Sequence, residues 1–372
     1  MHLFRLLPLG LAAYVTAQAL TDVLTQNSNT LSTLTSLLQT VPDIVQTLST
    51  AQNVTILAPS NDAFARLMAR NPRSTELTRN PRLLAGVLQY HVLQGKIAAN
   101  EITAVPKFPA TLLMSPFANV TGGQRVEVAL VNNTALVFSG YKQPAMVVTA
   151  DVAFSGGVVH IISEVLTVPA SPAQTAINTG LTSLAGALTM AGLADGINGL
   201  SDVTIFAPSN DAFKAIGSAT GSLSTQALAG ILAYHVLGNQ VRFSTDLIAA
   251  GSPVSLATAQ GTNLTLRREN GQLFVNSARV LIPDIPTTNG VVHVIDNVLN
   301  PANASAQPNP TASVQAPAFS GVTAVADAPF TSGIAPTATF VPASVPLNAG
   351  ISNTAPRAGF LLVAVGMMVA ML

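Results

Sequence analysis

The phrase "TILAPSNDAF" occupies residues 55–64, and a near copy, "TIFAPSNDAF", occupies residues 204–213. Two further blocks recur in the same order: "VLQYHVLQGKI" (87–97) returns as "ILAYHVLGNQV" (231–241), and "GGVVHIISEVLTVP" (156–169) returns as "NGVVHVIDNVLNP" (289–301). Three blocks repeated in order predict two copies of one domain, with the length differences absorbed by loops. The predicted copies span residues 20–168 and 171–300, and "PASPAQ" lies at the joint.

The repeated phrase contains the signals of a strand followed by a helix. Residues 54–57 are typical of a short buried strand, which Pro59 would end. Ser60 is placed to cap the next helix, and Asp62 would face the positive end of its dipole. Phe64 then points to the core, so the phrase is expected to serve the architecture of each copy.

Helices are expected early in each copy and strands late. Apolar residues have helical spacing in 31–41, 84–88, 181–188 and 228–232, whereas 126–130 and 264–266 alternate like a half-buried sheet. The Asn-Gly pair in "ENGQ" (269–272) is a hairpin turn signal. Helices followed by strands predict an α+β fold and not an alternating parallel one.

These blocks resemble the fasciclin (FAS1) domain family over nearly all of residues 20–300. The family's first signature, its Tyr-His pair and its Val-Val/Ile-His strand are matched by Thr55, Ala58, Pro59, Asp62, Ala63, Phe64, Tyr90, His91, Gly157 to His160, Thr204, Phe206, Ala207, Pro208, Asp211, Ala212, Phe213, Tyr234, His235 and Asn289 to His293. Gly156 stands where the family has Asn. The resemblance implies two tandem β-wedges of mainly antiparallel strands packed with helices. It also implies an extracellular adhesion role, and the short Ala/Ser/Thr-rich stalk and absent cysteines resemble fungal members.

Four histidines occupy equivalent places in the two copies, namely His91, His160, His235 and His293. A catalytic interpretation combines Ser60, Asp62 and His91, or Ser209, Asp211 and His235, as nucleophile, orienting group and base. A metal interpretation places two histidines and an aspartate of each copy on one ion. The third interpretation is a buried histidine that fastens a helix end to the sheet. The apolar runs around each histidine favour this structural role, so no catalytic, metal or cofactor site is predicted.

An Asp-Ile pair before the last block is the candidate adhesion epitope. Animal members of the resembled family use such a pair for integrin binding, and Asp284-Ile285 stands at that place, with Asp151-Val152 in the first copy. The sequence predicts an exposed epitope, stronger at Asp284 than at Asp151. A polar turn leading into a strand is the alternative. Pro42-Asp43-Ile44 has a similar composition but is expected to be a helix end.

Both chain ends carry targeting signals. Residues 1–19 have a short polar start, an apolar stretch and small residues before the predicted cleavage, which is typical of a secretory signal peptide. Residues 348–372 combine small residues, the spacer "ISNTAPRA" and an uncharged apolar tail from 359 to 372. This arrangement predicts GPI attachment at Asn348, with Gly350 as second choice. A tail-anchored membrane span is the alternative.

The composition indicates a protein of the cell exterior. Residues 301–347 are rich in Pro, Ala, Ser and Thr with Asp327 as their only charge, which predicts a disordered, O-glycosylated stalk or a plain linker. The candidate N-glycosylation sites are Asn53, Asn119, Asn132, Asn263 and Asn303. There is no cysteine, so disulfides and thiolate sites are excluded. A formal net charge of zero without basic runs argues against nucleic acid as a partner.

Two functional classes follow from these observations. The favoured one is a GPI-anchored protein on the outer face of the plasma membrane or in the cell wall. It would mediate adhesion or matrix organisation by binding a surface or matrix protein or a glycan. The alternative is a secreted hydrolase that uses the repeated Ser/Asp/His set.

Overall fold

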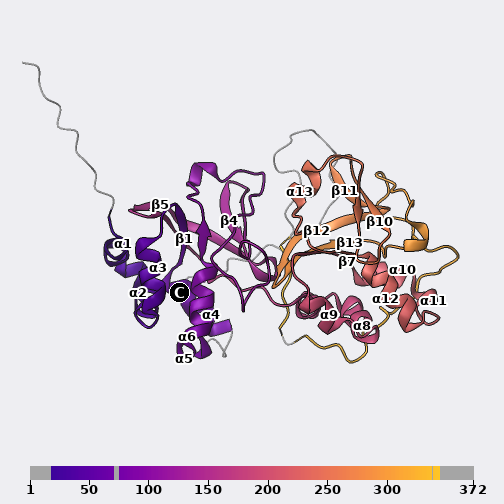
Figure 1. Cartoon of the computed structure of the whole chain (residues 1–372), viewed down its shortest axis with the longest axis horizontal. Coiled ribbons are helices and arrows are strands. Elements are labelled where there is room, and N and C mark those ends of the chain that lie inside the picture. Colours follow the sequence, from indigo (N-terminus) through magenta and orange to yellow (C-terminus); the bar gives the residue numbers. More distant parts are fainter. Residues whose placement is uncertain (1–17, 71–74, 337, 344–372) are drawn as a thin grey trace, which may run out of the picture.

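The chain folds into two α+β domains that lie side by side (Figure 1). The structure is a computed structural model, and it describes residues 18–70, 75–336 and 338–343. The predicted signal peptide, except its last two residues, and the predicted GPI signal lie outside the described residues. No helix in the described part is both long and apolar enough to cross a membrane.

Domain 1 begins with helices and ends with strands, as its sequence predicts. Its helices are α1 (Leu20–Gln26), α2 (Ser28–Gln39), α3 (Pro42–Thr50), α4 (Asn61–Arg70), α5 (Thr75–Arg79) and α6 (Pro81–Tyr90), with 3-10 turns η2 (Ala99–Glu101) and η3 (Gly140–Lys142). Its strands are β1 (Val54–Pro59), β2 (Val92–Gln94), β3 (Glu127–Val131), β4 (Thr134–Phe138), β5 (Pro144–Phe154) and β6 (Gly157–Ile162).

Domain 2 repeats this order. Its helices are α7 (Pro172–Asn178), α8 (Thr182–Met190), α9 (Ala194–Gly199), α10 (Asn210–Ala215), α11 (Gly217–Thr220), α12 (Thr225–Tyr234) and α13 (Ser244–Ala249), and the turn η4 (Pro301–Asn303) follows the last strand. Its strands are β7 (Val203–Pro208), β8 (Val236–Leu237), β9 (Val254–Ala257), β10 (Asn263–Glu269), β11 (Gln272–Val275), β12 (Ala278–Thr287) and β13 (Gly290–Ile295).

Each domain is built on a mixed sheet in which one strand pair is parallel. The described strands have the order β2-β1-β6-β5-β4-β3 in domain 1 and β8-β7-β13-β12-β11-β10-β9 in domain 2. The repeated phrase supplies β1 and β7, which pair in parallel with the last strand of their domain, β6 and β13. The other pairings are antiparallel. Because each phrase strand is central, every residue in β1 and β7 is buried.

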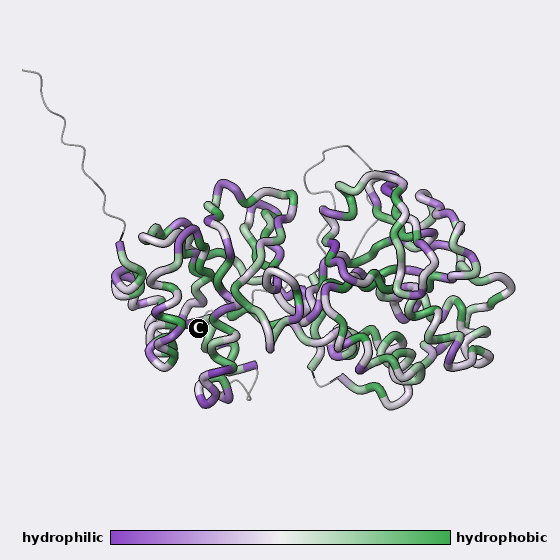
Figure 2. The backbone as a smooth tube through the Cα atoms, in the orientation of Figure 1, coloured by the Kyte–Doolittle hydropathy of each residue, from purple (hydrophilic) through white to green (hydrophobic). Residues whose placement is uncertain are grey.

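The cores lie where the helices cover these central strands. Phe64 packs with α2, α3 and α6 residues in domain 1, and Phe213 packs in the equivalent cluster of domain 2. The hydrophobic stretches of the chain lie mainly inside each domain in Figure 2. Ser60 caps α4 by accepting a hydrogen bond from the Ala63 amide at 3.2 Å, and Ser209 accepts from the Ala212 amide at 3.1 Å.

The C-terminal segment, residues 301–343 without 337, follows the outer edge of domain 2 and returns toward the joint between the domains (Figure 1). It contains no strand, and its only helical turn among the described residues is η4, as its proline-rich composition predicts. It is nevertheless packed, because Phe319, Val322, Phe330 and Ile334 contact the domain 2 core. In place of a free chain, the structure shows a segment that partly buries these four side chains on the domain before it, while Val314, Val325 and Val341 stay exposed.

Candidate functional site

The signature threonine holds each central strand against the loop that follows the second strand of its domain. Thr55 is fully buried; its hydroxyl donates to the Gly95 carbonyl at 2.8 Å and accepts from the Ile97 amide at 2.8 Å. Thr204 makes the same pair of bonds, to the Gln240 carbonyl and from the Arg242 amide, both at 2.8 Å. The buried hydroxyl thus satisfies two backbone groups of the loop.

The first pair of histidines lies at helix ends. His91 Nδ1 is 2.7 Å from the Val87 carbonyl, and its Nε2 accepts from the Leu166 amide at 2.9 Å. His235 repeats this with the Ile231 carbonyl at 2.8 Å and the Leu299 amide at 2.9 Å. Since an amide can only donate, each ring is neutral with its proton on Nδ1. Burial lowers the pKa of both histidines to about 4, against the opposing effect of the helix carbonyl.

The second pair of histidines lies on the last strands beside the candidate epitopes. His160 Nδ1 accepts from the Asp151 amide at 3.1 Å and its Nε2 lies 2.8 Å from the Ile97 carbonyl. His293 Nδ1 accepts from the Asp284 amide at 3.2 Å and its Nε2 lies 2.8 Å from the Arg242 carbonyl. These rings therefore carry their proton on Nε2. Burial lowers the pKa of His293, while the neighbouring Asp284 carboxylate acts in the opposite direction.

The Ser/Asp/His sets of the catalytic interpretation are not assembled. Both ring nitrogens of His91 and of His235 are used by backbone groups, so neither has a lone pair for a serine hydroxyl. Asp62 and Asp211 are exposed at the first turn of their helices, and Asp211 pairs with Lys214 at 3.1 Å. Within the described residues no group of three or more His, Cys, Asp or Glu side chains is placed to hold a metal ion.

Each domain has one small apolar cavity beside its helix-end histidine, His91 or His235, but the two cavities lie in different places: the first is at α4–α6 and the second is between α7–α9 and the central strands. They measure about 20 Å³ in domain 1 and about 30 Å³ in domain 2. A cavity of this size holds about one water molecule, so neither is a ligand pocket.

The two aspartates of the candidate epitopes differ in exposure, contrary to the sequence-based expectation. Asp284 and Ile285 are 2% and 0% exposed, whereas Asp151 is exposed and Val152 is half-buried. The Asp284 carboxylate accepts from the Ser244 amide at 2.7 Å and from the Ser244 hydroxyl, at the first turn of α13. Asp151 accepts from the Ala99 amide at 2.9 Å. The expectation of an exposed epitope at Asp284-Ile285 is therefore wrong, because domain 1 and α13 cover it.

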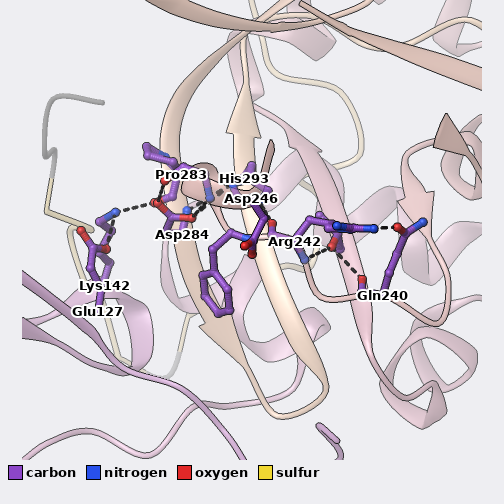
Figure 3. A network of polar contacts seen from close by, with 11 residues as sticks. Glu127, Lys142, Gln240, Arg242, Asp246, Pro283, Asp284 and His293 are labelled. Carbon is purple, nitrogen blue, oxygen red and sulfur yellow. Dashed lines mark hydrogen bonds and ion pairs between the residues drawn. The ribbon is translucent and has the colours of Figure 1, made fainter. Parts of the chain in front are cut away.

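A chain of buried polar groups crosses the joint between the domains beside Asp284 (Figure 3). Lys142 is fully buried, and its Nζ lies 2.9 Å from the Glu127 Oε2 and donates to the Pro283 carbonyl at 2.6 Å. Burial raises the pKa of Glu127 to about 7, Lys142 lowers it, and the Asp284 charge raises it again. The joint therefore contains a buried cation that belongs to domain 1 and contacts the backbone of domain 2.

Further hydrogen bonds and one ring contact close this joint. Thr121 donates through its amide at 2.8 Å and its hydroxyl at 2.6 Å to the two carboxylate oxygens of Asp202. Gln124 donates to the Thr287 carbonyl. Phe108 of domain 1 stacks on Phe243 of domain 2 with ring centroids 4.2 Å apart. The two domains are thus held by directional contacts on several sides of the joint.

Glu127 and Lys142 were not expected from the sequence. Glu127 alternates with Val126 and Val128, so a half-buried sheet would place its side chain in water. The available signal was a lysine between Tyr141 and Gln143 in an uncharged stretch. That signal indicates no partner, because Glu127 and Pro283 are distant in the sequence.

The predicted glycosylation sites separate into two groups. Asn53, Asn132 and Asn263 are exposed. Asn119 Nδ2 donates to the Leu200 carbonyl across the joint at 3.1 Å, and Asn303 Nδ2 donates to the Ala318 carbonyl at 3.0 Å. Asn348 lies outside the described residues. Asn119 is also exposed and Asn303 is half-buried, and because a glycosylated Nδ2 keeps one N–H, these two bonds do not exclude a glycan.

Comparisons with known proteins agree with the division of the chain into two similar domains. The chain matches the model of a family described as "Fasciclin domain" over residues 29–169 and 179–301. A "Fasciclin-like arabinogalactan protein" of Arthroderma benhamiae is 33% identical over 314 residues, covering 84% of this chain and 74% of that protein. "Fasciclin-like arabinogalactan protein elcF" of Phaeosphaeria nodorum is 32% identical, covering 80% and 93%. A solved FAS1 domain pair of the insect cell adhesion molecule Fasciclin I covers 72% of this chain and 96% of its own, with 21% identity and a TM-score of 0.35.

Proposed function

Because this chain belongs to the fasciclin domain family, we propose that it is a cell-surface protein that mediates adhesion or cell-wall organisation through its two domains. The observation that carries the proposal is the match of both domains to one adhesion-type family. The joint supports it, because the buried Lys142 and the Thr121–Asp202 bonds present the two domains as one body. The partner is a surface or matrix protein or a glycan.

The proposed contact residue is Asp151, not Asp284. Asp151 is exposed at the end of a strip on β5 where Met146 and Val148 are 44% and 53% exposed. At the equivalent places of β12, Arg279 is half-buried and Asp284 is buried, and only Leu281 is exposed. An exposed carboxylate beside exposed apolar side chains provides the two kinds of contact that small binding epitopes combine.

Adhesion of coated beads or cells to surface-protein and glycan arrays tests this proposal. Asp151→Ala with Val148→Ser should reduce binding while the melting temperature stays within a few degrees of the parent. The matched control is Leu281→Ser, which alters another exposed strand position (40% exposed) in domain 2. No binding by the parent protein to any surface component would refute the proposal, and binding unchanged by the double substitution would refute the epitope.

We also propose that the chain is exported and held by a GPI anchor at Asn348. The support is the sequence itself, with the apolar stretch in residues 1–19 and the uncharged tail at 359–372 behind a polar spacer. Treatment of membranes with phosphatidylinositol-specific phospholipase C should release the protein. Detection of the 359–372 peptide in the mature protein by mass spectrometry would contradict the anchor.

A further inference from the structure

Residues 319–334, here called the strap, run along the helical face of domain 2. The Ser218 amide donates to the Thr323 carbonyl at 3.1 Å, and the Thr323 amide donates back to the Ser218 hydroxyl at 2.8 Å. The Val325 amide donates to the Lys214 carbonyl at 3.1 Å. Phe330 meets Phe213 edge to face with centroids 5.9 Å apart. The strap therefore covers the phenylalanine that ends the repeated phrase.

Domain 1 covers the equivalent face with its own helices. Its α4 is ten residues long and is followed by α5, whose Leu77 lines the same small cavity as Phe64. In domain 2 the equivalent helix α10 has six residues and is followed by the four-residue α11 and a Gly-containing turn. The strap thus completes a domain that is shorter than its copy on this face.

Two glycines of domain 2 leave the space that the strap occupies. A Cβ on Gly186 would lie 1.7 Å from the Phe330 carbonyl oxygen, and a Cβ on Gly217 would lie 2.1 Å from Val325 Cγ2. When the repeats are aligned on the bonds from Thr33 to Asn61 and from Ser183 to Asn210, domain 1 has Ser36 and Met68 at these positions. Because domain 1 has larger side chains at both positions, only domain 2 has a groove that accepts the strap.

The strap is attached by few directional bonds. It contains no helix or strand, and Thr323, Ala324 and Val325 are exposed. Its only charge, Asp327, is also exposed. Segments with few buried contacts and few backbone hydrogen bonds open at a lower free energy than the domain beneath them.

We propose that the groove of domain 2 also binds the strap of a second copy of this chain, so that two molecules join by strap exchange. The groove is complementary to residues 319–334, whichever copy supplies them, because Gly186, Gly217 and Phe213 face strap residues that every copy possesses. An element that completes a domain from the end of a chain is suited to domain swapping, which makes a dimer without any new contact.

The chain's own strap has the advantage of tethering, which acts as a high effective concentration. Exchange therefore becomes appreciable where molecules are crowded, as on a surface. This inference is independent of the proposed adhesion to another molecule, since it concerns only contacts that the chain makes with itself.

The absence of cysteine allows a direct test with the full chain. Ser218→Cys and Thr323→Cys are prepared as separate proteins, mixed at rising concentration and oxidised. Strap exchange should give a dimer linked between residues 218 and 323, identified by non-reducing electrophoresis and by the cross-linked peptide in mass spectrometry. The double variant in one chain should close an intramolecular disulfide, which shows that the strap occupies the groove in solution.

Ala69→Cys is the matched control, because Ala69 occupies the place of Ser218 in domain 1. Mixed with Thr323→Cys, it should give no linked dimer above the level of random oxidation. Gly217→Met, which installs the domain 1 residue, should abolish the 218–323 link between copies. The proposal is overturned if the double variant closes within one chain but the mixture yields no 218–323 link. It is equally overturned if the double variant does not close, or if the Ala69→Cys control links as well.

Discussion

His91 and His235 show how single residues fasten this fold. Each neutral ring joins a helix carbonyl to a backbone amide that lies 64 or more positions along the chain. The neutral ring has one donor and one acceptor on opposite sides. A hydroxyl or a carboxylate could not join the same carbonyl and amide with this geometry. These two histidines therefore have a structural role, which rests on their hydrogen bonds and their burial.

The histidines should make the stability of the protein depend on pH. Their pKa values in the folded state, about 4, lie below the unfolded value of 6.5, so the unfolded state binds more protons as the pH falls. The contribution of each histidine to the free energy of unfolding is fully present above pH 6.5. It should be lost as the pH falls toward 4, by roughly 3 kcal/mol for each histidine. Urea unfolding between pH 7.5 and 4 measures this. His91→Gln with His235→Gln should flatten the dependence, and an unchanged slope would contradict the assignment.

Asp284 should act on stability and not directly on adhesion. Its carboxylate accepts two hydrogen bonds from buried Ser244, so Asp284→Ala leaves buried donors unsatisfied and should cost about 1–3 kcal/mol. Asp151→Ala removes the equivalent bond at an exposed site, where water can replace the carboxylate, and should cost less. Urea midpoints of the two variants make the comparison. Equal losses would show that burial at the joint does not set the difference.

At the scale of elements, the parallel strand pairs depend on close backbone contact. Gly290 begins β13, and a Cβ there would lie 1.8 Å from the Val203 carbonyl oxygen of β7. Gly157 has the same relation to Val54 in domain 1, with 1.9 Å. The glycine that precedes the Val-Val-His strand in both copies is therefore required by the approach of the central strand.

Gly290→Ala should destabilise domain 2 by about 1–3 kcal/mol or more, because either the alanine or the β7 backbone has to move. Gly230→Ala is the matched control in α12, where a Cβ would meet nothing within 4 Å. That substitution should stabilise the helix by roughly 0.5–1 kcal/mol. Thermal unfolding of both variants measures the contrast, and a tolerated Gly290→Ala would contradict the close approach.

At the scale of the whole molecule, a buried ion pair of domain 1 lies at the joint between the domains. Lys142 lies in η3, where the chain of domain 1 reaches β12 of domain 2. The C-terminal segment reaches the same place, since Phe340 stacks on Tyr141 with centroids 4.3 Å apart and the Phe340 amide donates to the Asn178 carbonyl at 2.8 Å. Both domains and the segment after them therefore meet around η3.

Lys142→Met should destabilise the protein by about 3–5 kcal/mol at pH 7.5, because Glu127 would be left buried without a cation. The folded-state pKa of Glu127 is already raised to about 7, and loss of Lys142 raises it further. The folded variant then binds a proton that the unfolded chain releases, so part of its stability should return as the pH falls from 7.5 toward 5.

Calorimetry at both pH values tests this prediction, together with Glu127→Gln/Lys142→Met as the control that removes both charges. The double variant should recover stability at pH 7.5 and lose the pH-dependent recovery. If Lys142→Met alone unfolds as the parent does, the ion pair does not hold the joint.

The sequence by itself determined what depends on neighbours along the chain. The repeated blocks defined two α+β domains, and the phrase at 55–64 and 204–213 contained its own strand, cap and core phenylalanine. The prolines of 301–347 predicted a segment without strands, and its described residues contain none, although they pack on domain 2 where disorder was expected. These features follow from periodicity, capping and proline geometry, which act over a few residues.

Only the tertiary structure decided which of two equivalent residues is exposed. Asp151 and Asp284 stand in matching sequences, yet domain 1 and α13 bury Asp284 and leave Asp151 in water. Lys142 pairs with Glu127 of its own domain and donates to the Pro283 carbonyl of domain 2 across the joint. The strap packs where the described part of domain 2 has no counterpart of helix α5. Burial at such places is set by surfaces that are distant in the sequence, so no local pattern of residues records it.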